Sequence, residues 1–345
     1  MKFCTLFISL FVSTGVAAQQ LPRIIGGSSI DLRNSPIAFI ETDRGSCTGS
    51  LVGPTEVLTA AHCIHGTSLS SVVIWINDTP RFPSTSYYSN YYSEIAGVAG
   101  NQGTDIGMFI LDTPIFDVPA LPVIVDLPMA AGIPVSVYGL GTNENSDLVE
   151  LGPANGKTAD VAILATTPGF IISNHFTSGA STCAGDSGGP MTFSLAGYEG
   201  IVGLLSGGDN VTNPLGQCVL GGGNSYHTKV STLLAQNFLA SFPGVQYLSG
   251  RNMMFLAWLE SAADNFTIAA QNQTNKRFIK KQIRKMIMNL KQAKLWASDL
   301  QRIQGIRKSI RLLRKARKAR KRRQFKLLNK FGAKVVELGS LPISP

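Results

Sequence analysis

Hydrophobic and polar positions follow short, strand-like runs over the first two thirds of the chain. "SVVIWIN" (71–77), "IPVSVYGLG" (133–141) and "YEGIVGLLSGG" (198–208) are rich in β-branched, aromatic and other apolar residues, with Gly, Pro, Asn and Asp between them. "DIGMFIL" (105–111) and "ADVAILAT" (159–166) have the same character. Short strands at this spacing predict an all-β fold, either a barrel or a sandwich.

Two segments depart from this pattern. Residues 113–134 contain five prolines, which a central strand does not tolerate, so we expect a connector between two β halves. "VSTLLAQNFLASF" (230–242) has apolar residues at helical spacing and is followed by Pro243 and Gly244. This segment therefore predicts a helix that closes the β region.

A different periodicity begins beyond Gly250, after a boundary near residues 248–275. Apolar residues recur at alternating spacings of four and three, then slip and resume, which predicts an amphipathic helix or coiled-coil stripe. The first part of the stripe is Ile279, Ile283, Met286, Leu290, Ala293, Ala297 and Leu300, and the second is Ile303, Ile306, Ile310 and Leu313. We expect at least one long helix here, in a tail that is helical or partly disordered.

The net charge of +10 is divided unevenly along the 345 residues. Residues 24–250 hold five Lys or Arg against seventeen Asp or Glu, whereas residues 251–345 hold twenty-four against four. An acidic β region thus precedes a basic extension. Clustered cations over residues 276–334 indicate a polyanion partner, namely a heparin-like glycan, an anionic membrane or a nucleic acid.

Three other interpretations of the basic extension stay open. It is a solvated segment without a partner, since charge runs usually face solvent. Alternatively it docks onto the acidic β region and restrains it, or it is removed at the basic run 320–323 and released as a cationic peptide.

The N-terminus indicates export. Residues 1–18 contain a Lys, an apolar run and a small-residue end, which predict a secretory signal peptide cleaved after Ala18. No later segment has the ~18 apolar residues of a transmembrane helix, so we expect a secreted, extracellular protein without a transmembrane segment. Candidate N-glycosylation sites are Asn77, Asn210, Asn265 and Asn272.

Four cysteines remain once the signal peptide takes Cys4 with it. In an oxidising compartment Cys47, Cys63, Cys183 and Cys218 predict two disulfides, with three pairings open from the sequence alone.

Candidate chemistry lies in three short motifs. Hydrolysis of an amide requires a nucleophile, a base, a group that orients the base, and donors for the developing oxyanion. "CAGDSGGP" offers Ser187 as the nucleophile, "LTAAHC" offers His62 as the base, and "GTDIGMFIL" offers Asp105 to orient it.

The chain from Ile24 to about Phe242 resembles the trypsin/chymotrypsin-like serine peptidases. The motifs that carry the resemblance occur in the family's order: "RIIGG" (23–27), "TAAHC" (59–63), "DIGMFIL" (105–111), "GDSGGP" (185–190) and "LLSGG" (204–208). The resemblance implies an all-β fold of two antiparallel six-stranded β-barrels with a C-terminal helix. It implies a serine endopeptidase domain over residues 24–250, and it does not cover the basic extension, residues 251–345.

The resemblance also implies roles for individual residues. Ser187 attacks the substrate, His62 transfers the proton and Asp105 orients the imidazole. The N–H groups of Gly185 and Ser187 form the oxyanion hole, and Ser206 lies beside the aspartate and the substrate backbone. No cofactor and no metal are implied. The family pattern pairs Cys47 with Cys63 and Cys183 with Cys218, and we expect His65, His175 and His227 at the surface or in loops.

An activation step is implied at the N-terminus of the family segment. Residues 19–23 resemble a short activation peptide, so the secreted form is expected to be a zymogen. Cleavage after Arg23 gives Ile24 a charged amine that pairs with Asp186, and such a buried ion pair requires good geometry.

Substrate preference follows from Ser181, which corresponds to the pocket floor for the residue before the scissile bond. Ser181 offers no carboxylate to a Lys or Arg substrate, whose unpaired charge would cost several kcal/mol. Gly208 leaves the slot open, which favours protein or peptide substrates cleaved after large apolar or aromatic residues, as in chymotrypsin. A separate trypsin-like protease is then the expected activator.

Two alternatives to this specificity and function stay open. Gly207 stands where many relatives carry a large aromatic residue, and either Asn224 or Ser225 narrows the pocket, so an elastase-like preference for small apolar residues remains. A catalytically idle peptidase scaffold, binding through its tail, is the competing class of protein.

Overall fold

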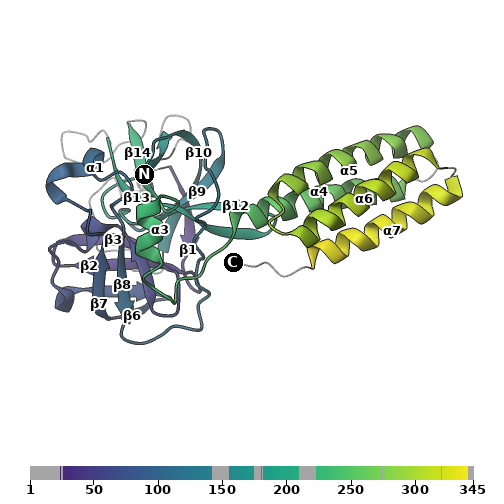
Figure 1. Ribbon diagram of the computed structural model, residues 1–345. Helices are drawn as coiled ribbons and strands as arrows, with labels where there is room; N and C mark the ends of the chain where they lie inside the picture. Colours follow the sequence, from purple (N-terminus) through teal and green to yellow (C-terminus); the bar gives the residue numbers. More distant parts are fainter. Residues whose placement is uncertain are drawn as a thin grey trace, which may run out of the picture.

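The computed structural model describes residues 24, 26–141, 155–174, 180, 182–209, 223–272, 275–319 and 321–340. A β part is followed by a helical part that extends away from it as a rod (Figure 1). The strands are β1 (Ser28–Asp31), β2 (Ile37–Thr42), β3 (Gly45–Leu51), β4 (Glu56–Thr59), β5 (Val73–Ile76), β6 (Thr79–Arg81), β7 (Pro83–Tyr88), β8 (Gly107–Leu111), β9 (Pro134–Gly139), β10 (Asn155–Thr166), β11 (Phe170–Asn174), β12 (Pro190–Leu195), β13 (Tyr198–Gly208) and β14 (Asn224–Lys229). Short helices in this part are η1 (Ala61–Cys63), η2 (Leu69–Ser71), η3 (Glu94–Ala96), α1 (Gly97–Gly100) and α3 (Leu233–Leu239).

The second half of the β part is a closed antiparallel barrel. Its strands follow the order β10, β11, β14, β13, β12 and β9, and β9 pairs back onto β10. β1 adds to β10 outside this ring, with Ser28 opposite Thr158. The predicted six-stranded barrel is therefore present here, and its interior buries Val137, Val161 and Met191.

The first half of the β part is a curled sheet that stays open. Seven strands follow the order β6, β5, β2, β3, β4, β8 and β7, and no ladder joins β6 to β7 within the described residues. The prediction of a second closed six-stranded barrel is wrong in this half. Pro80 lies in β6 and Pro83 begins β7, and because proline has no N–H to donate, both strands suit a sheet edge.

The predicted connector and closing helix both occur. Residues 113–133 hold no strand longer than the isolated bridges of Val123, to Tyr247 and to Ile201. Helix α3 begins after Thr232, whose hydroxyl accepts the N–H of Ala235 at 3.1 Å, and it buries Leu239 in a core shared by both β halves.

The basic extension folds into a four-helix bundle. Its helices are α4 (Gly250–Gln271), α5 (Lys276–Trp296), α6 (Leu300–Lys318) and α7 (Lys321–Gly339). Short connections make successive helices antiparallel neighbours, and contacts between α4 and α7 close the bundle. None of the described helices has the length and apolar character that crossing a membrane requires.

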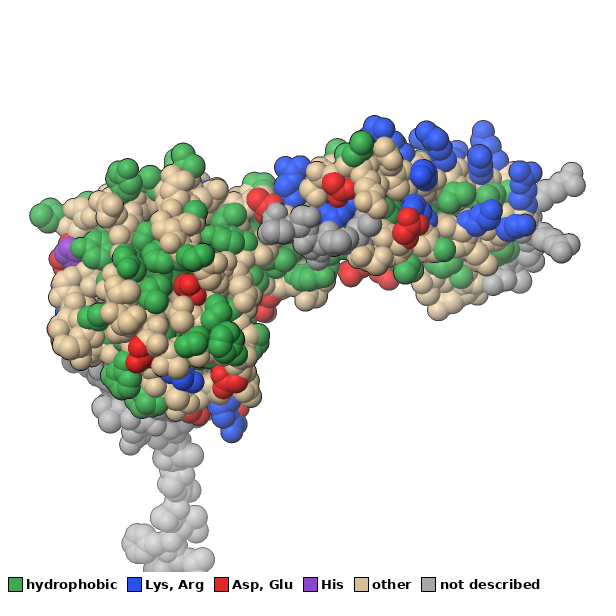
Figure 2. Space-filling view, turned by 60° about the horizontal axis from the view of Figure 1, so that its bottom comes forward, with side chains coloured by type: hydrophobic (Ala, Val, Ile, Leu, Met, Phe, Trp, Pro, Cys, Tyr) green, Lys and Arg blue, Asp and Glu red, His purple; other side chains and the backbone are tan. Residues whose placement is uncertain are grey.

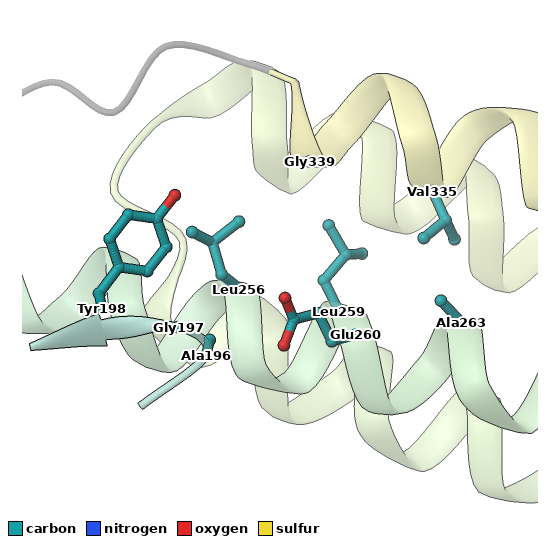
Figure 3. Close-up of a pocket in the computed structure, with 9 residues that line it drawn as sticks. All are labelled: Ala196, Gly197, Tyr198, Leu256, Leu259, Glu260, Ala263, Val335 and Gly339. Atoms are coloured by element: carbon teal, nitrogen blue, oxygen red, sulfur yellow. The ribbon is translucent and has the colours of Figure 1, made fainter. Parts of the chain in front are cut away.

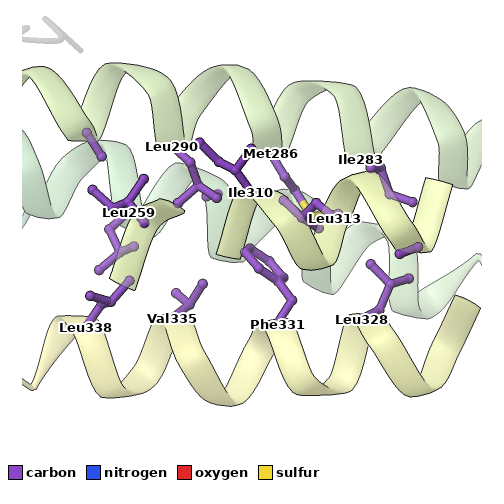
Figure 4. Packing of buried hydrophobic residues seen from close by; sticks show 14 of the residues in the cluster. Leu259, Ile283, Met286, Leu290, Ile310, Leu313, Leu328, Phe331, Val335 and Leu338 are labelled. Carbon is purple, nitrogen blue, oxygen red and sulfur yellow. The ribbon is translucent and has the colours of Figure 1, made fainter. Parts of the chain in front are cut away.

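One hydrophobic core fills the bundle, and all four helices contribute to it (Figure 4). The predicted stripe is buried from Ile279 to Ala297, but Leu300 is 64% exposed, so the prediction is wrong at that position. The reason is a break in the chain direction, since α5 ends at Trp296 and α6 begins at Leu300. The sequence pattern also missed α4, whose residues were assigned to a domain boundary.

The bundle is attached to the closed barrel at the start of α4. Asp126 of the connector accepts the Ser249 hydroxyl at 2.8 Å and the Gly250 N–H at 2.6 Å, which caps the helix N-terminus. Met253 is buried in the barrel core. Beside this contact, a groove of about 500 Å³ lies between the β12–β13 turn and helices α4 and α7 (Figure 3).

Candidate active site

His62 and Asp105 lie together at the ends of two neighbouring strands. His62 is on η1, just after β4, and Asp105 precedes β8, which pairs with β4. The Nδ1 atom of His62 is 2.8 Å from Oδ2 of Asp105, and the His62 backbone N–H donates to Oδ1 at 3.0 Å. A carboxylate acceptor at Nδ1 fixes the proton there, so Nε2 is left as a proton acceptor.

A serine from the other β half completes the environment of Asp105. Ser206, on β13, donates its hydroxyl to Asp105 Oδ2 at 2.6 Å, and Asp105 is only 2% exposed. The buried carboxylate therefore accepts three hydrogen bonds, which satisfy its oxygen atoms inside the protein. Nearby, burial raises the pKa of Tyr92 to about 12, and the negative charges of Asp105 and Glu94 add to the increase.

The segment around Ser187 is held by both β halves. From β3, the Thr48 N–H donates to the Ser187 carbonyl at 2.8 Å, and the Thr48 hydroxyl donates to the Gly185 carbonyl at 2.9 Å. From β13, the Leu205 carbonyl accepts the Gly188 N–H at 2.8 Å. Ser187 thus lies where the open sheet meets the closed barrel.

Gly185 adopts a backbone conformation that favours glycine. Its φ is +89°, and a Cβ atom built there would lie 2.7 Å from the Cα of Gly141.

Among the hydrogen bonds of the described residues, none joins Ser187 to His62. Such bonds are often long in unliganded peptidases and tighten when the substrate binds.

Asp186 is fully buried beside the nucleophile. Its carboxylate accepts the Gly141 N–H at 2.7 Å and the Cys183 N–H at 2.8 Å, and it therefore ties the loop after β9 to the segment that holds both Cys183 and Ser187. The Ile24 residue is 1% exposed and belongs to the barrel core. Arg23 lies outside the described residues.

A disulfide fixes the loop that carries His62. Cys47 and Cys63 are joined, with Cα atoms 6.2 Å apart, as the family pattern implied. These sulfur atoms and a His62 ring nitrogen lie within 4.8 Å of one another, but disulfide sulfurs are not thiolate ligands for a metal. Cys183 is also disulfide-bonded, and its expected partner Cys218 lies outside the described residues.

Buried polar side chains lie next to the expected pocket floor. Ser181 itself is outside the described residues, but its neighbour Thr182 is buried, and its hydroxyl is 2.6 Å from that of Ser225. Of the two residues expected to narrow the pocket, Ser225 is the buried one. The side chain of Asn224, which is partly exposed, bonds to Asn174 instead.

His227 is a residue that the sequence pattern misplaced. It is 1% exposed, and its Nε2 lies 3.3 Å from the Ser173 hydroxyl, so its expected surface location is wrong. Alternation along β14 puts residues 225 and 227 on the same inward face, which is the signal that would have found it. His65 does lie near the surface, 3.3 Å from Glu94, and His175 is outside the described residues.

The segment that contains α1 lies next to Gly207, the position where many relatives carry a large aromatic residue. A Cβ atom at Gly207 would lie 2.7 Å from Cγ2 of Val98, on α1. The segment is fixed by Asn101, whose side chain bonds the backbone of Ser93 and Gly97. Val98 therefore occupies space next to Gly207 that a larger residue would need, whereas Gly208 is exposed.

The glycosylation candidates occupy different environments. Asn77 follows β5 with a φ of +53°, and its side chain accepts the Asn34 N–H at 2.9 Å. Asn265 lies on α4 and donates to the Ser261 carbonyl, while Asn272 follows that helix. Asn210 lies outside the described residues.

Comparison with known proteins agrees with this geometry. A family model described as Trypsin matches residues 24–229. The chain belongs to the trypsin family. It is therefore a serine peptidase of the hydrolase class, with protein or peptide substrates, and the family match stops before the bundle.

Curated members of the trypsin family are similar at low identity. Trypsin of Saccharopolyspora erythraea is 25% identical over 206 residues, covering 55% of this chain and 89% of the relative. Kallikrein 1-related peptidase b27 of Mus musculus is 25% identical over 222 residues, covering 55% and 83%. Brachyurin of Leptuca pugilator is 27% identical over 197 residues, covering 51% and 84%.

Proposed function

We propose that this trypsin-family member is a secreted serine endopeptidase, made as a zymogen, with Ser187, His62 and Asp105 as its catalytic triad. The observation that carries the proposal is the buried Asp105 carboxylate, which holds Nδ1 of His62 at 2.8 Å and the hydroxyl of Ser206 at 2.6 Å. A carboxylate satisfied in this way costs less to bury, and its charge stabilises an imidazolium as His62 gains a proton.

The mechanism follows from these positions. Ser187 Oγ attacks the substrate carbonyl carbon while its proton passes to Nε2 of His62, and the oxyanion accepts the N–H groups of Gly185 and Ser187. His62 then gives the proton to the leaving amine as the C–N bond breaks, which leaves an acyl-enzyme. A water molecule, deprotonated by His62, hydrolyses the ester and restores Ser187.

Labelling with a fluorophosphonate probe tests this function. Such a probe reacts with an activated serine, so we expect the Arg23-cleaved protein to be labelled and its Ser187→Ala variant not to be. An unlabelled cleaved protein would favour the idle scaffold that acts as a binding protein.

Activation is proposed to require a cut between Arg23 and Ile24 by a trypsin-like protease. The new amine of Ile24 would then pair with Asp186, whose complete burial and contacts with Gly141 and Cys183 make it suited to lock the oxyanion loop. Arg23→Gln should secrete normally and stay inactive after trypsin treatment. Full activity of this variant after the treatment would exclude the switch.

The proposed specificity is cleavage after large apolar or aromatic residues, since Ser181 supplies no carboxylate for a cationic substrate. The buried contact between Thr182 and Ser225 favours an elastase-like preference as the second candidate, because Ser225 adds volume beside the floor. Peptide-library profiling of the Arg23-cleaved enzyme separates the two. A preference for Phe, Tyr, Leu or Met supports the first, and a preference for Ala or Val supports the second.

The basic extension is proposed to bind a polyanion through residues 276–334. Its arrangement argues against a restraint on the active site. Val98, on α1, contacts Gly207 next to Ser206, and Figure 1 shows α1 at the end of the molecule opposite the bundle.

A further inference from the structure

Exposed Lys and Arg residues occur on α5, α6 and α7. Figure 2 shows Lys and Arg side chains gathered along one side of the bundle and toward its free end, while the β part shows few. We propose that this face is a binding site for an extended sulfated glycan. The choice of a glycan rests on the proposed secretion of the protein, because sulfated glycans are polyanions of the extracellular space. The face is named the cationic face below.

The cationic face is ordered by helical periodicity. Arg307, Arg311, Arg314 and Lys318 follow one another at spacings of four, three and four, and all are exposed. They therefore form one stripe about 16 Å long on the outside of α6. Other exposed cations lie on the two helices that pack against α6, namely Lys276, Arg277, Lys281, Arg284, Lys285, Lys291 and Lys294 on α5, and Arg323, Lys326 and Lys330 on α7.

These cations have almost no acidic neighbours. Among the described bundle residues, the ion pairs are Arg302 with Asp299 and Lys334 with Glu337, and neither includes a residue of the α6 stripe. Like charges at helical spacings of three and four repel one another. A polymer that brings several anions at once would relieve this repulsion and release its own counterions, which favours binding.

The bundle has neither the exposed apolar face that binds a lipid bilayer nor the exposed aromatic rings that bind single-stranded nucleic acid, within its described residues. The apolar faces of its helices are buried in their own core, whereas a helix that binds a bilayer must present an apolar face to it. The exposed large hydrophobic side chains of the described bundle residues are Ile268, Met288, Leu295, Leu300 and Val336, none of them aromatic. Proteins that bind single-stranded nucleic acid generally stack bases on exposed aromatic rings.

The attachment of the bundle gives the bound enzyme an orientation. The cap by Asp126 and the burial of Met253 join α4 to the closed barrel. The bundle extends away from the end of the β part where α1 lies (Figure 1). A glycan on the cationic face would therefore hold the peptidase at a matrix while its substrate cleft stays accessible.

The test compares two triple variants of the full chain, each in a Ser187→Ala background so that the binding result does not depend on peptidase activity. One variant carries Arg307→Gln, Arg311→Gln and Arg314→Gln. The matched control carries Arg33→Gln, Lys157→Gln and Arg251→Gln, which removes the same charge away from α5 to α7. Calorimetry with a sulfated oligosaccharide measures affinity at several salt concentrations, and circular dichroism checks that helix content is unchanged.

We expect the α6 variant to lose at least about tenfold in affinity, and its slope of log K against log salt to fall by about 2 to 3, since each lost contact removes nearly one unit. The control should bind like the parent, and Arg→Lys replacements at the three α6 positions should keep most of the affinity. Equal affinities of the two triple variants would overturn the proposal. Tighter binding of duplex DNA or of anionic vesicles than of the oligosaccharide would overturn the choice of a glycan.

Discussion

The β part and the helical bundle differ in how a function is distributed over residues. In the β part, His62 and Ser206 come from distant segments and both bond to the buried carboxylate of Asp105. In the bundle, apolar residues of α5, α6 and α7 fill a shared core, and most of the cations of these helices are exposed. Chemistry that depends on one geometry is therefore sensitive to single side chains, whereas binding by many similar charges is not.

Removal of the nucleophile should produce the largest difference between the two parts. Ser187→Ala should lower kcat by roughly 10⁶-fold, a loss typical of such a triad. Affinity for a sulfated oligosaccharide should stay unchanged, because the bundle is not touched. Steady-state kinetics with a peptide substrate and calorimetry on the same preparation measure both, and a parallel loss of glycan affinity would contradict the independence of the two parts.

A cavity in the bundle core should lower the stability of the bundle and leave peptidase activity unchanged. Phe331 is fully buried and packs edge to face on Phe266, with ring centroids 6.0 Å apart. Phe331→Ala should cost about 3 to 5 kcal/mol of bundle stability, measured by denaturant unfolding, while activity on a small neutral peptide is retained. Val336→Ala, at an exposed position of the same helix, is the control and should change stability by less than about 0.5 kcal/mol.

Ser206→Ala tests the positioning of Asp105 by the second β half. Loss of a hydrogen bond to a charged carboxylate costs about 1.5 to 3 kcal/mol, so kcat/KM should fall by roughly 10- to 100-fold. Ser241→Ala removes a hydroxyl that donates only to the exposed Asn237 carbonyl and should leave the rate unchanged. An unaltered rate for Ser206→Ala would show that the imidazole is held without this bond.

Gly207→Leu should give the smallest of these effects, and it has a built-in rescue. A Cβ atom at this position lies 2.7 Å from Cγ2 of Val98, so the larger residue should cost about 1 to 3 kcal/mol through overpacking. Val98→Gly in the same chain should recover part of the loss. A double-mutant cycle by thermal unfolding gives the coupling, and additive effects would mean that the two side chains do not compete for space.

The candidate site was more predictable than the architecture. His62, Asp105 and Ser206 were assigned from motifs and the family resemblance, and both His62 and Ser206 lie within hydrogen-bond distance of Asp105. The first β half was predicted to be a closed barrel, but it is an open sheet with proline-containing strands β6 and β7 at its edges. The prediction failed because strand periodicity does not reveal which edge strands pair. His227 was assigned to the surface or to a loop, but it is buried, although alternation along β14 would have placed it inward.

The sequence by itself determined the local features of this protein: the strand-like and helical periodicities, the division into an acidic and a basic part, and the three motifs with their chemistry. These features depend on neighbours within a few residues. Tertiary structure alone decided which strands close, that Ser225 rather than Asn224 is buried, and that α4 and the three basic helices α5, α6 and α7 form one bundle with a shared core. Those outcomes depend on contacts between residues far apart in the chain, whose free energies no local pattern contains.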